Sequence, residues 1–173
     1  MKRAVTVLLP LLTLVLLLTF GFKPTDVNAE EVDYQISSYL VRVDFIPVPD
    51  VEKHAIGTYE RRGVAVFKNG ETAAYHTRGT WDFIDSNGPF QGYTTLNYKD
   101  GSMTLVKYEG EMSKPEGASL PTLKGKGDFI KGTGKYEGIK GNVSFTGEYV
   151  TPYGKETKGD SVMNVRANYT LTK

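Results

Sequence analysis

Residues 132–145, GTGKYEGIKGNVSF, decide the architecture of this chain. Glycine occupies positions 132, 134, 138 and 141, and an alternating segment follows. Each interior glycine costs a helix roughly 1 kcal/mol relative to alanine, so this density excludes a helix. Glycine also reaches positive φ and lets neighbouring backbones approach closely, as tight turns and barrel corners require. The stretch therefore predicts two strands that turn tightly within a curved sheet.

Alternating apolar and polar residues continue on both sides of this stretch, which is the pattern of half-buried strands. Hairpin signals such as Asn69-Gly70 and Asp100-Gly101 separate the alternating segments. No segment repeats apolar residues at helical spacing for long enough to predict a helix. The predicted strands are 39–45, 58–67, 71–84, 90–98, 102–112, 123–130, 136–150 and 161–172.

The order of these segments favours one closed sheet. Only residues 114–121, which contain two prolines and Gly117, are expected to form an open loop. Antiparallel strands of this number most simply close into a barrel, because closure removes the unpaired edges. A sandwich of two sheets stays open as the alternative.

The N-terminus carries the order of a secretory signal. Met1-Lys2-Arg3 is a positive head, and a predominantly apolar run extends from Ala4 to Phe22. Val27 and Ala29 place small or β-branched residues three and one positions before Glu30, the spacing that a signal peptidase reads. A retained membrane anchor is the alternative, since the run approaches the ~20 residues that span a bilayer.

No cluster of charges follows the apolar run, so we expect cleavage after Ala29. This predicts a signal peptide over residues 1–29 and a single β-barrel domain over residues 30–173. We expect the protein to be exported to the periplasm or the extracellular side of a bacterial envelope. We expect no stable membrane insertion after cleavage.

Composition excludes several classes of function. The chain has 21 basic and 20 acidic residues without a basic stripe, so nucleic acid is not an expected partner. It contains no cysteine, so packing and not disulfides must stabilise it, and a lipid-anchored lipoprotein is excluded. Its only histidines are His54 and His76, which together with Asp44 and Asp82 make a poor metal site, and we expect neither a metal nor a cofactor.

Two segments carry a family resemblance. Residues 79–112 read GTWDFIDSNGPFQGYTTLNYKDGSMTLVKYEGEM, and residues 123–150 read LKGKGDFIKGTGKYEGIKGNVSFTGEYV. Their order is a strand with Gly92-Tyr93, then D-G-S, then x-x-E-G, then the hairpin G-T-G-x-[YF]-x-G-x-x-G. In this order the chain resembles the allene oxide cyclase barrel superfamily, which also contains the dirigent proteins and uncharacterised bacterial families. It looks like an uncharacterised bacterial member.

The resemblance implies a fold more than a reaction. It implies an all-β, eight-stranded antiparallel up-and-down β-barrel of the allene oxide cyclase or calycin type, with an apolar cavity and often a homotrimer. The plant cyclases carry acidic and amide groups on the first strand and a cysteine in the cavity, whereas residues 33–43 here read DYQISSYLVRV and cysteine is absent. Dirigent proteins use paired aspartates near the cavity mouth, which this sequence does not provide at recognisable positions. No catalytic residue of either group is carried over.

The predicted strand 71–84 presents two different faces. Alternation favours Trp81 and Phe83 on the inside. The opposite face carries a polar cluster, which is solvated if it points outward and needs a partner such as Glu109 if it points inward, because an unpaired buried charge costs several kcal/mol. The members of this cluster are His76, Arg78, Thr80 and Asp82.

Aromatic residues supply the candidate walls of a cavity. Tyrosine suits such walls because it combines an apolar body with one polar tip, although it also suits the outer face of a barrel. The cavity candidates are Tyr75, Trp81, Phe83, Tyr93, Tyr108 and Glu109.

Three functions remain open at this point. The first is an exported barrel that binds a small apolar or amphipathic molecule in its cavity, as barrels of this size have room to do. The second is a cofactor-independent cyclase or isomerase of the allene oxide cyclase or dirigent type, in which confinement steers a reactive substrate. The third is a structural envelope protein that acts through its surface. We favour binding over catalysis because the sequence names no acid–base pair.

Overall fold

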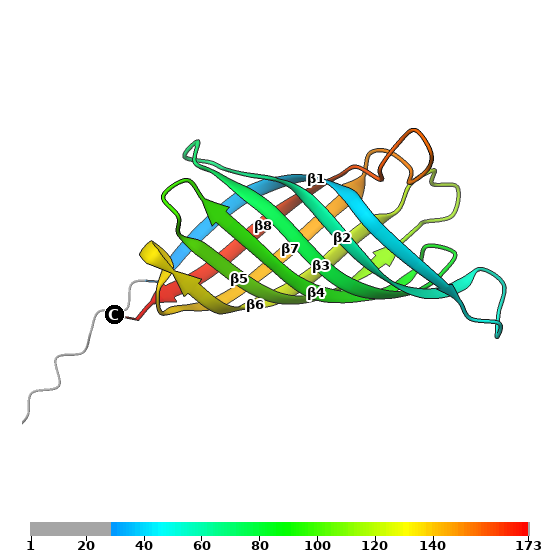
Figure 1. Cartoon of the computed structure of the whole chain (residues 1–173), viewed down its shortest axis with the longest axis horizontal. Helices are drawn as coiled ribbons and strands as arrows, with labels where there is room; N and C mark the ends of the chain where they lie inside the picture. The colour runs from blue at the N-terminus through cyan, green and yellow to red at the C-terminus, as the bar shows by residue number, and fades with distance from the viewer. Residues whose placement is uncertain (1–28, 173) are drawn as a thin grey trace, which may run out of the picture.

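The computed structural model describes residues 29–172, which form one closed β-barrel. Each strand is antiparallel to its neighbours in the chain, and the last strand pairs with the first (Figure 1). The strands are β1 (Glu30–Pro47), β2 (His54–Phe67), β3 (Thr72–Ile84), β4 (Gly88–Tyr98), β5 (Met103–Ser113), β6 (Thr122–Thr133), β7 (Ile139–Tyr149) and β8 (Ser161–Leu171). The predicted eight-stranded up-and-down barrel is confirmed, and the sandwich is excluded. The predicted signal peptide lies outside the described residues except for Ala29.

The glycine-rich stretch forms the turn between β6 and β7. Gly134, Gly138 and Gly141 have φ values of +60°, +75° and +143°, a region that favours glycine. Residues Gly134–Tyr136 form a single 3₁₀ turn, η1, so β7 begins at Ile139 and not at Tyr136 as the alternation predicts. The tight strand pair is therefore confirmed, and only its boundary is corrected.

Two β-bulges change which residues face the interior. In the β1–β2 pair the register shifts between Leu40 and Arg42 and leaves Val41 without a partner. Leu40 is buried before the shift, and Val43 and Phe45 line the interior after it. The bulge thus reverses the odd–even rule along β1, as an extra residue in one strand must. A second shift, opposite Leu105 on β5, acts on β6 in the same way.

The two ends of the barrel are built differently. Short hairpin turns, the start of β1 and the end of β8 lie at one end, which we name the turn end. The connections 48–53, 85–87, 114–121 and 150–160 lie at the other, which we name the loop end. Figure 1 shows the longer connections gathered at this loop end, opposite the end of β8.

Packed aromatic rings fill the turn end. The ring centroids of Tyr34 and Phe67 lie 4.7 Å apart, and those of Tyr98 and Tyr136 also lie 4.7 Å apart. Phe67 joins the two pairs through a 5.8 Å contact with Tyr98, and Tyr169 packs on Tyr136 at 6.2 Å. Tilted and edge-on rings at these distances are the favoured aromatic geometry. These five residues form what we call the aromatic floor, which closes one end of the interior.

Candidate ligand cavity

A cavity of about 590 Å³ extends from the middle of the barrel to the loop end. Side chains from all eight strands line it, together with residues of the loop-end connections. Its volume lies within the roughly 300–1,000 Å³ of typical small-molecule sites. Most of the lining is apolar or aromatic, and its charged members are Lys53, Arg61, Asp85 and Lys114.

Glycines in the wall make room for two tyrosines. A Cβ at Gly79 would lie 2.6 Å from the hydroxyl of Tyr59, and a Cβ at Gly92 would lie 2.6 Å from the hydroxyl of Tyr108. Each phenol therefore lies over bare backbone, where any larger residue would displace it. As a result the two hydroxyl oxygens meet inside the barrel, 2.5 Å apart.

These phenols belong to a directed chain of hydroxyl groups. Thr77 donates its hydroxyl proton to the carbonyl oxygen of Tyr93, at 3.0 Å, so its Oγ1 can only accept from Tyr108, at 2.8 Å. Tyr108 has then used its own proton and must accept from Tyr59. Tyr59 is the first donor in this series of hydroxyl groups, and its oxygen can still accept a hydrogen bond.

Burial keeps both phenols protonated. Desolvation, followed by the proximity of Tyr108, raises the pKa of Tyr59 well above 10, and desolvation also raises the pKa of Tyr108. Neither side chain can therefore serve as a base near neutral pH. The pair offers a cavity ligand neutral hydrogen-bonding groups.

Arg61 of β2 is the charged group inside the barrel. Its side chain is only 6% exposed, although it lines the cavity. The guanidinium donates to Ser161 Oγ and to the carbonyl oxygen of Gly159, both at 2.7 Å, and to the hydroxyl of Tyr149 at 3.1 Å. It also lies 5.0 Å from the centre of the Tyr149 ring. Arg61 thus connects the cavity wall to the β7–β8 connection.

Aromatic side chains form the wall near the loop end. Trp81 stacks on Phe83 at 5.0 Å and meets the edge of Phe45 at 4.9 Å. Phe45 is 59% exposed at the end of β1, whereas Trp81 is 6% exposed. Lys53 and Asp85 form an ion pair of 3.5 Å beside these rings. A ligand that enters from the loop end would pass this aromatic and charged rim.

Four of the six predicted cavity residues lie in the cavity wall. They are Tyr75, Trp81, Phe83 and Tyr108. Trp81 faces inward and Asp82 outward, so the orientation that we favoured for the third strand is confirmed.

Tyr93 and Glu109 are corrections, because both lie on the outer face. Tyr93 is 50% exposed, and Glu109 pairs with Lys126 across the surface at 3.3 Å. The alternation of inward and outward residues in the sequence already indicated the outer face for both. Tyr93 shares its face with polar Gln91, and Glu109 follows Tyr108 directly, so Glu109 cannot share its side of the strand.

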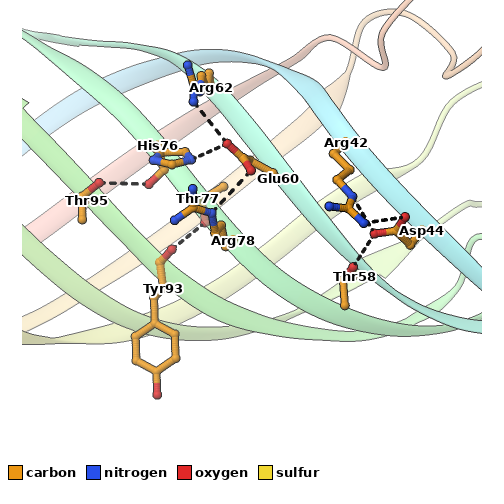
Figure 2. A network of polar contacts seen from close by, with 10 residues as sticks. All are labelled: Arg42, Asp44, Thr58, Glu60, Arg62, His76, Thr77, Arg78, Tyr93 and Thr95. Carbon is orange, nitrogen blue, oxygen red and sulfur yellow. Dashed lines mark hydrogen bonds and ion pairs between the residues drawn. The ribbon is translucent and has the colours of Figure 1, made fainter.

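The predicted polar cluster divides into two sets on the outer surface. His76 Nε2 lies 2.8 Å from a carboxylate oxygen of Glu60, and Arg78 Nε lies 3.4 Å from the other. Figure 2 shows Arg62 reaching the same carboxylate from β2, at 3.4 Å. The partner of this set is thus Glu60 and not Glu109.

Asp82 belongs to the second set, at the loop end. The ring of His54 lies between two carboxylates, with Nδ1 2.5 Å from Asp50 and Nε2 2.8 Å from Asp82. Asp50 first, and then Asp82, raises the pKa of His54 above its usual value. This contact ties the β1–β2 connection to the end of β3. Within residues 29–172, no group of three histidine or acidic side chains has an arrangement that could hold a metal ion.

Sequence reasoning missed Arg61 and Tyr59. One signal was present: Arg61 and Arg62 are adjacent in a strand, so one of them must face inward. The inward face of β2 also carries Gly57 and Ala65, small residues that leave space beside a long side chain.

Comparisons with known proteins support the fold. No protein-family model and no curated protein matches the chain. A conserved protein of unknown function from Rhodopseudomonas palustris has a similar structure, with a TM-score of 0.50 and 12% identity over 82% of this chain and 97% of that one.

Two pterocarpan synthase dirigent proteins, GePTS1 and PsPTS1, are also similar, each with a TM-score of 0.44 and 12% identity. The alignments cover 88% and 84% of this chain and 97% of each dirigent protein. At these identities a likeness concerns the barrel fold alone, so the site must be argued from its own residues.

Proposed function

We propose that this protein binds a small apolar or amphipathic molecule inside the barrel. The observation that carries the proposal is the cavity of about 590 Å³, closed at one end by the aromatic floor and lined mainly by apolar side chains. Burying apolar ligand surface in such a space is favourable by roughly 25 cal/mol per Å². We further propose, on the N-terminal sequence alone, that the protein is exported to a bacterial envelope.

The geometry supports binding better than catalysis. A cyclase or isomerase would need a proton donor and acceptor beside the substrate. Asp85 is the single carboxylate in the described lining, and it is paired with Lys53 at the rim. Tyr59 and Tyr108 stay protonated, so neither supplies the base. A purely structural envelope protein would leave the cavity unused. The following experiment distinguishes this role from ligand binding.

Trp81 provides the readout, because it is the only tryptophan and lies in the cavity wall. We expect its emission to shift and saturate when the purified protein is titrated with a series of fatty acids and terpenoids. A flat response across the series, with no competition against an apolar fluorescent probe, would contradict ligand binding.

A pair of matched variants tests whether the ligand is inside. Val106 lines the cavity, whereas Val64 is 46% exposed on the outer face of β2. Val106→Phe adds the same atoms inside that Val64→Phe adds outside. We expect Val106→Phe to weaken binding at least about tenfold, equivalent to 1.4 kcal/mol, and Val64→Phe to leave it unchanged. Equal effects would place the ligand elsewhere.

A further inference from the structure

The guanidinium of Arg61 is a buried cation without an acidic partner. No carboxylate within residues 29–172 lies at ion-pair distance from it. Its hydrogen-bond acceptors are all neutral: the hydroxyl oxygens of Ser38, Ser161 and Tyr149 and the carbonyl oxygens of Ser38 and Gly159. Neutral acceptors compensate the lost hydration of a charge only in part.

Donor capacity also remains beside this cation. Nη1 of Arg61 carries two hydrogens and has one acceptor, the hydroxyl of Tyr149. Tyr149 accepts this bond, and its own proton has no acceptor among the described residues. Both residues line the cavity, so one N–H and one O–H are left for whatever occupies it.

The charge of the lining points in the same direction. Asp85 offsets Lys53, with which it pairs at 3.5 Å. Arg61 inside and Lys114 at the rim then have no acidic counterpart in the cavity. Because Arg61 is withdrawn from water, its attraction for an anion is screened far less than that of a surface lysine.

We propose that Arg61 and Tyr149 form an anion subsite and that the ligand is an amphipathic organic anion. Its carboxylate binds the free N–H of Arg61 and the hydroxyl of Tyr149, and its apolar body lies against the aromatic and aliphatic walls. Hydrogen bonds to a charged group are stronger than neutral ones, and planar carboxylates suit a guanidinium. This inference rests on the proposed binding function and adds the chemical class of the ligand.

Decanoate and decanol give a sharp test, because they share an apolar chain and differ in charge. The neutral alcohol leaves water more readily, so a cavity that recognises only apolar surface would bind decanol more tightly. With the subsite we expect the reverse at pH 8, with decanoate at least about tenfold tighter by isothermal titration calorimetry below micellar concentrations. This preference should disappear as the pH falls and the ligand becomes protonated.

Two variants locate the effect. Arg61→Gln removes the charge inside the barrel, and Arg62→Gln removes the charge of the next residue, which lies on the outer face of the same strand. We expect Arg61→Gln to lose the preference for decanoate and still bind decanol, and Arg62→Gln to keep the preference. Circular dichroism verifies that each variant is folded. If Arg61→Gln does not fold, the ranking of the two ligands by the unaltered protein and its pH dependence decide.

Each outcome distinguishes the two proposals. If decanol binds and decanoate binds no more tightly, the anion subsite is overturned while the binding function stands. A folded Arg61→Gln variant that retains the preference also overturns the subsite. If neither ligand binds, both proposals are wrong.

Discussion

The turn end and the loop end are opposite solutions to the same problem, the filling of a barrel. At the turn end Tyr34, Phe67 and Tyr98 pack ring against ring, each 9% exposed or less. At the loop end Phe45 and Tyr153 are more than half exposed, and both line the open cavity. The dense core of the turn end stabilises the closed sheet by burying apolar surface, whereas the loop end holds the cavity.

This comparison assigns different tasks to the aromatic residues. Rings of the floor contribute to stability, because each buries a large apolar area. Rings of the rim, such as Trp81 and Phe83, line the open cavity. If the division holds, equivalent perturbations at the two ends should differ in size and in the property that they affect.

The largest effect should come from high pH, acting on the floor. Burial raises the pKa of Tyr34, Tyr98 and Tyr136 above 10, so the folded state holds protons that the unfolded state releases. Their contribution to stability is complete below pH 10 and is lost as the pH rises through the folded-state values. Each tyrosine can cost about 1.4 kcal/mol per pH unit in that range. We expect cooperative alkaline unfolding, followed by circular dichroism and by tyrosinate absorbance.

Tyr34→Phe is the matched control for this experiment. The hydroxyl of Tyr34 takes part in no hydrogen bond among the described residues, so its removal should leave the fold intact at neutral pH. The variant should unfold less steeply with pH. Tyrosinate absorbance that rises fully before the circular dichroism changes would contradict a floor of buried phenols.

Truncation of a floor ring should have the next largest effect. Phe67 is 7% exposed and packs between Tyr34 and Tyr98. We expect Phe67→Ala to lower the free energy of unfolding by about 3–5 kcal/mol in urea denaturation followed by circular dichroism. Phe45→Ala at the rim should cost less than about 1 kcal/mol, because that ring is 59% exposed. Similar losses at the two ends would refute the division.

The smallest effect should come from the His54 contact at the loop end. Both ring nitrogens face carboxylates, so both must donate and the protonated ring is favoured. The raised pKa means that this contact is fully present below about pH 6.5 and is lost as the pH rises through the folded-state value. We expect Asp82→Asn to lower the pKa of His54 in an NMR titration, with little change in global stability.

Asp44→Asn is the control for that titration, since Asp44 binds Arg42 and Thr58 and not His54. A histidine that titrates at or below its usual value in the unaltered protein would contradict the contact. If His54 titrates above its usual value, the two pH experiments together would show that the loop end responds near neutral pH and the turn end only in base.

The fold could be predicted because its signals are local. Asn69-Gly70 supplied the hairpin between β2 and β3, where Gly70 has φ +83°. Alternation placed Trp81 inside and Asp82 outside. The boundary at Tyr136 was wrong, because a 3₁₀ turn continues the apolar pattern without extending the strand.

The site could be predicted only in part. Tyrosine occurs on both faces of this barrel, so residue type alone could not assign the cavity wall. As a result the prediction was wrong for Tyr93 and correct for Tyr108. Strict use of alternation would have removed Glu109 from the predicted cavity residues. The bulge near Val41 was not visible in the pattern, and it decides which residues of β1 line the cavity.

By itself, the sequence determined a closed antiparallel barrel of short turns, because turn residues and period-two alternation act over a few neighbouring positions. Only the tertiary structure decided that the barrel is filled at one end and hollow at the other. That outcome depends on ring contacts between strands far apart in the chain. The burial of Arg61 has the same origin, since its neighbours Ser38, Tyr149 and Ser161 come from three other strands that meet only when the barrel closes.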